Sequence, residues 1–159
     1  MYLQDNFIKN KKLQGELRAV TAKGFNWFDS KDNPKNSIYS LIKKVWPKHN
    51  YEGFEYWVID YPVGDSMDWH NDKDEYAYKN FNTIVTPDEG IVYYTHAEDL
   101  EGGVLEISNG PRKEIKIHPK TNRLVRFKTG MPHRVTKIKK GKRKAILVNA
   151  WTNKPQTFL

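Results

Sequence analysis

The first fifty residues carry apolar side chains at helical intervals, and the rest of the chain follows a different pattern. Apolar residues three or four positions apart lie on one face of a helix. In the first expected helix these residues are Leu13, Leu17 and Val20. In the second they are Ile38, Leu41, Ile42 and Val45. Ser37 can cap the second helix and Pro47 follows its end. The stretch 24–34 between the helices carries turn signals, so we expect a loop there.

From Tyr51 onward, short segments rich in β-branched and aromatic residues alternate with Gly and Pro, the pattern of strands and turns. The expected strands are 54–61, 66–72, 83–86, 91–96, 104–108, 114–118, 124–128, 133–138 and 144–151. The turn residues between them include Gly102, Gly103 and Gly141. Eight or nine strands at this spacing favour a β-sandwich or jelly roll. We therefore predict a mainly β fold in which the N-terminal helices pack on one sheet.

The length of 159 residues fits a single domain. We expect residues 1–50 to form a helical support and residues 51–159 a β-rich core. The chain has no cysteine, which excludes disulfides, thiolate metal sites and a cysteine nucleophile. Aromatic residues make up 13% of the chain, which argues against disorder despite a mean hydropathy of -0.81.

The chain is basic, with 27 Lys and Arg against 19 Asp and Glu and a net charge of +8. This excess leaves nucleic acids, acidic proteins and small anions open as partners. The first dozen residues lack the apolar segment of a signal peptide, and no apolar run approaches the roughly 18 residues that span a bilayer. We expect a cytoplasmic protein without a membrane partner, in the host cytoplasm if a phage encodes it. The oligomeric state stays open, with a monomer favoured.

Three residues form the candidate metal site. His70 and Asp72 are two positions apart on an expected strand, so their side chains point to the same face. His133 begins another expected strand. Two histidines and one carboxylate are the ligands of a facial triad that binds Fe(II) and leaves three positions open. An H-x-D pair alone is more often a polar surface pair, so the surrounding motifs matter.

Those motifs follow one another in a defined order. They are Tyr61-Pro-Val-Gly, Trp-His70-Asn-Asp72, Ile-Val-Tyr-Tyr94, Glu-Gly-Gly-Val-Leu-Glu-Ile107, Pro-His133-Arg-Val and Lys-Arg143-Lys-Ala-Ile-Leu-Val. In this order the chain resembles the Fe(II)/2-oxoglutarate-dependent dioxygenases over roughly residues 54–151. It looks most like the prolyl-hydroxylase branch, including the hydroxylases that act on the hypoxia-inducible factor.

The resemblance implies a double-stranded β-helix, which is a jelly roll with iron at its open end. It implies Fe(II), 2-oxoglutarate and dioxygen as cofactor and cosubstrates, with ascorbate as a candidate reductant. The implied metal ligands are His70, Asp72 and His133. The implied 2-oxoglutarate contacts are Arg143, Tyr94, Tyr61 and Leu105. The implied reaction splits 2-oxoglutarate to succinate and carbon dioxide and hydroxylates a prolyl residue in a peptide or protein.

Elementary electrostatics supports the role of Arg143 separately. A guanidinium inside a small barrel is costly unless an anion meets it. 2-Oxoglutarate is a dianion, and arginine can hold one of its carboxylates through two parallel hydrogen bonds.

Two departures from this branch lie at the mouth of the expected site. The stretch 73–90, with Tyr76, Tyr78 and Phe81, is longer than in the hypoxia enzymes, and Asn149 stands where they have a tryptophan. The stretch is either a lid that closes over substrate or a hairpin of 83–86 with 91–95 whose tyrosines pack in a rigid core.

Other classes of protein remain as alternatives. The run His70-Asn-Asp-Lys-Asp-Glu75 also resembles AlkB-type nucleic-acid demethylases, and the positive charge fits them. Those enzymes carry a second arginine six residues after the first, where this chain has Asn149. A noncatalytic jelly-roll binding module is the third alternative.

Several other polar residues are expected to be structural or exposed. We expect His96 and His118 to be satisfied or surface histidines, and Asp74 and Glu75 to be solvated. We expect the basic stretch 137–144 to form an exposed turn with only Arg143 pointing inward. The alternative for Tyr61 and Tyr94 is that they are ordinary core or rim aromatics.

Overall fold

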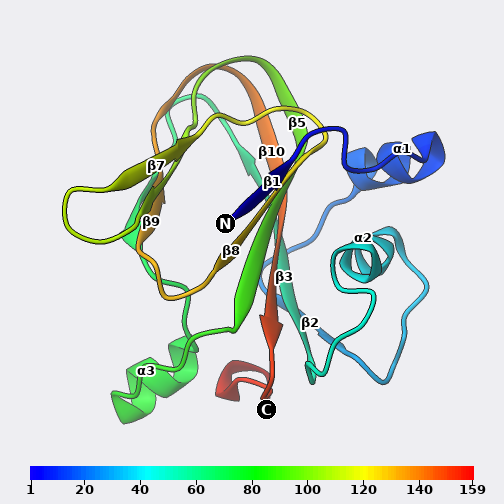
Figure 1. Cartoon of the computed structure of the whole chain (residues 1–159), viewed down its shortest axis with the longest axis vertical. Coiled ribbons are helices and arrows are strands. Elements are labelled where there is room, and N and C mark those ends of the chain that lie inside the picture. The colour runs from blue at the N-terminus through cyan, green and yellow to red at the C-terminus, as the bar shows by residue number, and fades with distance from the viewer.

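The computed structural model describes residues 1–159 and has three layers. Two antiparallel sheets face each other, and the N-terminal helices cover the outer face of the larger sheet (Figure 1). This arrangement confirms the predicted jelly roll with helices packed on one sheet. None of the helices combines the length and the apolar character needed to cross a membrane.

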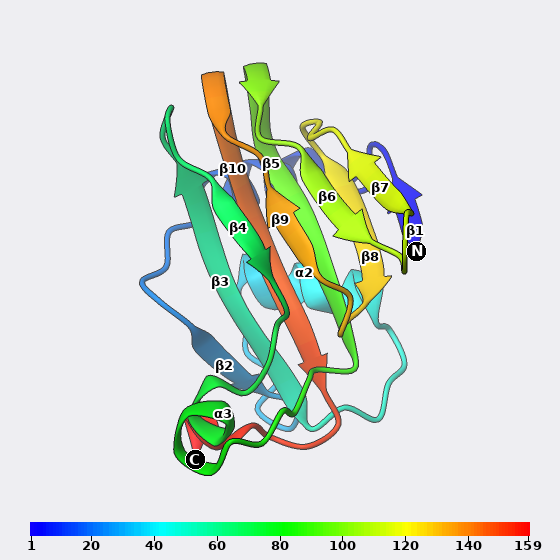
Figure 2. The same ribbon diagram turned by 90° about the vertical axis from the view of Figure 1, so that its left-hand side faces the viewer.

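Ten strands form the two sheets, and Figure 2 shows the smaller sheet in front of the larger one. The larger sheet has, in spatial order, β1 (Tyr2–Gln4), β8 (Arg123–Lys128), β5 (Glu89–Gly102), β10 (Ile138–Trp151), β3 (Gly53–Tyr61) and β2 (Asn26–Asp29). The smaller sheet has β4 (Met67–His70), β9 (His133–Val135), β6 (Leu105–Ser108) and β7 (Glu114–Ile117). The longest strands, β5 and β10, pair with each other at the centre of the larger sheet.

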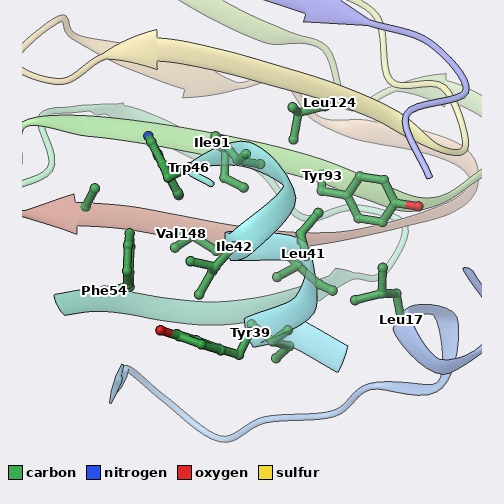
Figure 3. Close-up of a cluster of buried hydrophobic side chains, with 14 of the residues drawn as sticks. Leu17, Tyr39, Leu41, Ile42, Trp46, Phe54, Ile91, Tyr93, Leu124 and Val148 are labelled. Carbon is green, nitrogen blue, oxygen red and sulfur yellow. The ribbon is translucent and has the colours of Figure 1, made fainter. Parts of the chain in front are cut away.

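The two supporting helices are α1 (Lys11–Ala19) and α2 (Ser37–Val45). The side chains of Asn10 and Asn36 cap them by accepting hydrogen bonds from backbone N–H groups of the first turn. The cap of α2 is therefore Asn36, one residue before the predicted Ser37. The apolar helix faces form a core with the outer face of the larger sheet, as Figure 3 shows for residues such as Leu17, Leu41 and Tyr93.

A second core lies between the sheets. Alternation along β5 divides its side chains between the two cores, because successive residues of a strand point to opposite faces. Tyr93 packs under the helices, whereas its neighbour Tyr94 packs between the sheets with Leu105 and Val125. The candidate site occupies one part of this inter-sheet space.

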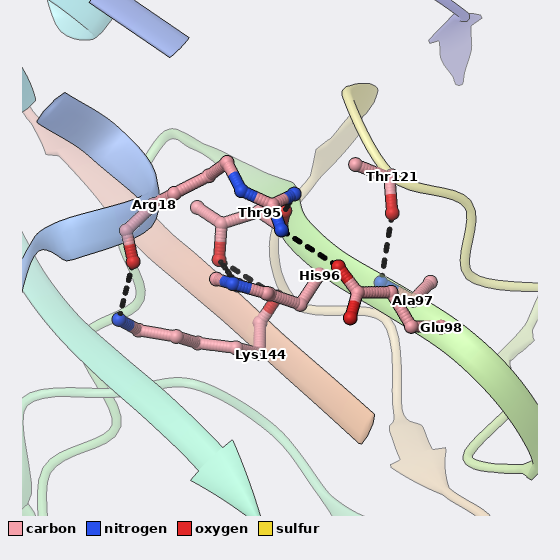
Figure 4. Close-up of polar contacts among 7 residues, drawn as sticks. All are labelled: Arg18, Thr95, His96, Ala97, Glu98, Thr121 and Lys144. Carbon is pink, nitrogen blue, oxygen red and sulfur yellow. Dashed lines mark hydrogen bonds and ion pairs between the residues drawn. The ribbon is translucent and has the colours of Figure 1, made fainter. Parts of the chain in front are cut away.

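A polar cluster holds α1 against the larger sheet (Figure 4). Arg18 donates to the Thr95 carbonyl oxygen at 3.0 Å and pairs with Glu98 at 2.6 Å. The Lys144 ammonium donates to the Arg18 carbonyl oxygen at 2.9 Å. Lys144 is therefore buried together with Arg143, and the prediction of an exposed turn over 137–144 is wrong. The stretch belongs to β10, and Gly141 lies within this strand.

Four further elements differ from the sequence predictions. Strands β1 and β2 lie in the N-terminal region, and β2 occupies part of the expected loop 24–34. Residues 83–86 form no strand, because the chain builds the helix α3 (Glu75–Phe81) and then runs to β5 without regular structure. A short 3-10 turn, η1 (Gln156–Phe158), ends the chain beside α3.

Candidate active site

The candidate metal ligands meet where β4 pairs with β9. The antiparallel register places His70 directly opposite His133, and Asp72 follows two residues beyond the end of β4. The Asp72 Oδ1 atom lies 3.6 Å from His70 Nε2 and 3.5 Å from His133 Nε2. One possible ligand atom from each residue lies within 4.8 Å of the other two. The structure thus brings together the three residues that the sequence singled out.

Backbone carbonyls orient both imidazole rings. His70 Nδ1 contacts the Asp68 carbonyl oxygen at 2.8 Å, and His133 Nδ1 contacts the Met131 carbonyl oxygen at 3.0 Å. A carbonyl can only accept a hydrogen bond, so each Nδ1 carries a proton, and in the neutral imidazole each Nε2 then has a lone pair directed toward Asp72. This neutral tautomer leaves Nε2 free to bind a metal, while the backbone carbonyl fixes the ring through Nδ1.

The charges of the site favour an ionised carboxylate. Burial alone would raise the pKa of Asp72, but hydrogen bonding and charge from His133, together with the Asn149 bond, hold this pKa below its ordinary value. Burial works against the charged form of His133, but Asp72 raises the pKa of this imidazole. A carboxylate flanked by two imidazoles is a donor set for a divalent cation.

A cavity of about 270 Å³ adjoins these ligands, between the two sheets. One wall is a ladder of alternate residues from β3 and β10, which pair directly across the strands. The four pairs of this ladder are Tyr61 with Arg143, Ile59 with Ala145, Trp57 with Leu147, and Glu55 with Asn149. The wall is therefore polar at its two ends and apolar in the middle.

Arg143 forms one end of the wall and is 2% exposed. Its Nε atom donates to the Gly103 carbonyl oxygen at 2.9 Å, and its guanidinium lies 5.4 Å from the centroid of the Tyr61 ring. Gly103 has a φ of +65°, and a Cβ atom there would lie 2.8 Å from Arg143 Cδ. Arg143 forms no ion pair with any acidic residue. This end can accept an anion.

Tyr94 and Leu105 lie near the same end. The Arg143 guanidinium is 5.2 Å from the Tyr94 ring centroid, and the buried Tyr94 hydroxyl has no hydrogen-bond partner. Burial raises the pKa of this hydroxyl, so it stays protonated and able to donate. Leu105 lines the cavity, whereas Tyr94 is not among the lining residues.

The other end of the wall lies beside the candidate metal ligands. Asn149 donates to Asp72 Oδ2 at 3.1 Å and faces Glu55 Oε2 at 3.5 Å. Burial raises the pKa of Glu55 to about 7. Our sequence reading missed Glu55, although a signal was present: it is six residues before Tyr61, so the period of two places both side chains on one face of β3.

The helix α3 stands at the mouth of the site. Asp74 caps α3 and accepts hydrogen bonds from the backbone N–H groups of Gln156 and Thr157. Asp74 is 2% exposed, so the prediction of a solvated carboxylate is wrong for this residue. The hairpin alternative for 73–90 is also wrong, because the aromatic residues of α3 are exposed rather than packed in a core. These aromatics are Tyr76, Tyr78 and Phe81.

The two remaining histidines of interest lie away from the ligand cluster. His96 is buried and contacts the Thr95 hydroxyl at 3.0 Å, and His118 is exposed. Neither belongs to a group of residues able to share a metal ion. This agrees with their expected structural or surface roles.

Comparison with known proteins gives a match to one family. The family description "2OG-Fe(II) oxygenase superfamily" matches residues 56–153. No curated protein matches the chain.

Solved structures share the fold at low sequence identity. A prolyl-4-hydroxylase from Pseudomonas putida has a TM-score of 0.64 and 19% identity, over 96% of this chain and 92% of that one. A Trichoplax adhaerens prolyl hydroxylase, in complex with a hypoxia-inducible factor peptide fragment, has a TM-score of 0.60 and 18% identity, over 95% and 83%. A Burkholderia pseudomallei oxidoreductase of the 2OG-Fe(II) oxygenase family has a TM-score of 0.53 and 10% identity. The match covers 73% of this chain and only about half, 51%, of that one.

Proposed function

The chain belongs to the 2OG-Fe(II) oxygenase superfamily, and from this premise we propose that it hydroxylates a prolyl residue of a peptide or protein. The observation that carries the proposal is a single cavity with a metal-competent triad at one end and an unpaired buried arginine at the other. Such a cavity has a place for iron, for a dicarboxylic cosubstrate and for a substrate side chain.

The donor set fits iron. His70, Asp72 and His133 supply two imidazole nitrogens and one carboxylate oxygen from a cluster small enough to share one ion. When bound, iron and 2-oxoglutarate activate dioxygen: one oxygen atom enters a substrate C–H bond as hydroxyl, the other enters succinate, and carbon dioxide leaves. His70, Asp72 and His133 would hold the ion at the end of the cavity next to α3.

Arg143 fits the far carboxylate of 2-oxoglutarate. Its buried guanidinium has no acidic partner within the protein, and an anion would supply that partner. The Tyr61 ring adjoins the guanidinium, Leu105 lines the cavity, and the orphaned Tyr94 hydroxyl is available to donate. Arg143, Tyr61 and Leu105 line that end and would bind the cosubstrate and exclude water, while Tyr94 lies against the Arg143 guanidinium outside this lining.

The outer part of the cavity suits a proline ring. Phe25 and Trp57 both line the cavity, with ring centroids 5.1 Å apart, and Phe25 is 59% exposed. Aromatic-lined grooves bind proline-rich segments because the extended proline conformation is preformed and presents apolar rings. The peptide bound to the Trichoplax adhaerens enzyme supports a peptide as the substrate class.

Binding followed by turnover tests the proposal. Anaerobic titration should show that the protein binds Fe(II) and then 2-oxoglutarate. Proline-containing peptides should then gain one oxygen atom by mass spectrometry while succinate forms, and His70→Ala protein should form neither product. Demethylation of methylated oligonucleotides without peptide oxidation would replace the prolyl substrate with the nucleic-acid alternative. Failure to bind either ligand would contradict the proposed site.

A further inference from the structure

The two oxygens of the Asp72 carboxylate have different surroundings. Oδ1 faces both candidate imidazole ligands, at 3.6 Å and 3.5 Å. Oδ2 accepts a hydrogen bond from Asn149 Nδ2 at 3.1 Å. One oxygen is therefore directed toward the position of the metal, and the other is held by an amide.

The surroundings of Asn149 fix the orientation of this amide. Its Nδ2 faces two carboxylate acceptors, Asp72 Oδ2 and Glu55 Oε2, so the NH₂ group must be on that side. Its Oδ1 faces Gly90, where a Cβ atom would lie 2.7 Å from that oxygen. Asn149 is 3% exposed and lies in a strand that is paired on both sides. The amide therefore has little freedom to turn away from Asp72.

On the basis of the proposed iron site, we propose that Asn149 is a positioning residue that makes Asp72 bind the metal through Oδ1 alone. A carboxylate can bind a metal through one oxygen or through both. Binding through both would take one of the three positions that a facial triad leaves open. By holding Oδ2 with a hydrogen bond, Asn149 keeps these three positions available for the cosubstrate and dioxygen.

Loss of the hydrogen bond should weaken metal binding and change the coordination. Hydrogen bonds to metal ligands typically contribute 10- to 100-fold in metal affinity. We therefore expect Asn149→Leu, which has a similar volume and no donor, to bind Mn(II) about 10- to 100-fold more weakly than the wild type. Asn149→Ala is a second variant that removes the donor without adding an apolar group.

Two measurements separate positioning from a merely structural role. Calorimetric titration of the metal-free protein with Mn(II) gives the affinity, and the visible absorption of the Co(II)-loaded protein reports the coordination geometry. The matched control is Asn122→Ala, which changes another buried asparagine, one that binds backbone atoms of Ile8 and the Tyr93 hydroxyl far from the ligand cluster. This control should lower the melting temperature but leave Mn(II) affinity and the Co(II) spectrum unchanged.

The outcomes distinguish the two proposals. Weaker Mn(II) binding and an altered Co(II) spectrum in both Asn149 variants support the positioning role, provided that Asn122→Ala keeps the wild-type Mn(II) affinity and Co(II) spectrum. Unchanged affinity and spectrum in the Asn149 variants overturn that role but leave the proposed oxygenase site intact. If the wild-type protein binds neither metal ion, the proposed site itself is wrong and the positioning role falls with it.

Discussion

Replacing Arg143 by methionine should separate the stability of this protein from its ligand binding. Methionine keeps a long, flexible side chain but removes a buried cation that has no acidic partner. The change loses the charge-assisted hydrogen bond from Nε to the Gly103 carbonyl oxygen, which is worth roughly 1.5–3 kcal/mol. It also removes the cost of burying an unpaired charge, which is at least as large. The ligand-free variant should therefore melt at the wild-type temperature or above it.

The effect on 2-oxoglutarate should be large and unfavourable. Loss of a charge-assisted contact to a buried anion costs roughly 2–5 kcal/mol, which weakens binding about 30-fold to over 1,000-fold. A ligand at 100 times its Kd stabilises a folded protein by about 2.7 kcal/mol. For a chain of this size, that raises the melting temperature by roughly 5–11 °C. The same concentration should stabilise the variant by less than about 1 kcal/mol.

Thermal melting of the Mn(II)-loaded protein with and without 2-oxoglutarate measures both effects. Lys142→Met is the matched control, because it removes one positive charge from the adjacent, exposed position of β10. This control should keep the full shift with 2-oxoglutarate. Equal shifts in the wild type and Arg143→Met would refute the role of Arg143. A much lower melting temperature of the ligand-free variant would show that Arg143 supports the fold instead.

Three further predictions concern the metal ligands, a buried acid and the mouth of the site. His70→Ala should abolish tight Mn(II) binding in calorimetry because it removes one of three ligands, whereas His118→Ala should leave binding nearly unchanged. A similar loss of Mn(II) affinity in both variants would exclude the proposed ligand set. The folded-state pKa of Glu55, about 7, exceeds its ordinary value of 4.5, so the stability from its protonated form is present at low pH and is lost as pH rises through 7. The free energy of unfolding of Glu55→Gln should therefore increase relative to that of the wild type between pH 5 and 8, by on the order of 3 kcal/mol. Chemical unfolding measures this difference at each pH. A difference that does not change with pH would contradict the assigned pKa. Hydrogen exchange across 73–82 should be fast with metal and 2-oxoglutarate bound, because α3 is seven residues long and buries only Ala77. Exchange should become slower when substrate is added. Strong protection that substrate does not change would show that the segment is a rigid part of the fold.

Local patterns in the sequence predicted most of the fold. The spacing of Leu41, Ile42 and Val45 identified α2, and short β-branched and aromatic segments between Gly and Pro turns identified most strands of the two sheets. Both central strands are longer than predicted, because Gly102 and Gly141 suggested turns. These glycines instead lie within paired strands at φ values of +80° and +88°, next to facing backbone that leaves no room for a Cβ atom. A glycine in the sequence suggests a residue with positive φ. The sequence does not show whether that residue lies in a turn or inside a paired strand.

The remaining differences come from contacts between distant parts of the chain. The short strand β2 forms because it pairs with β3, and the turn residues around it hid this pairing. Asp74 is buried because the C-terminal residues bind it from 82 and 83 positions away. In the site, His70, Asp72, His133 and Arg143 could be picked out by type and order. The link between Asn149 and Asp72 required the fold.

The wall formed by β3 and β10 also limits the length of the molecule that can occupy the cavity. Arg143 and Asn149 both lie on β10, six residues apart, so the strand itself fixes the distance between the guanidinium and the amide that binds Asp72. The register with β3 keeps both side chains on the cavity face, because a one-residue slip would turn them to the opposite face. Selection among dicarboxylic acids would then depend on chain length: an acid one methylene shorter or longer than 2-oxoglutarate could engage the metal or Arg143 well, but not both. Cosubstrate choice would then depend on the extended backbone of β10 as much as on any single side chain.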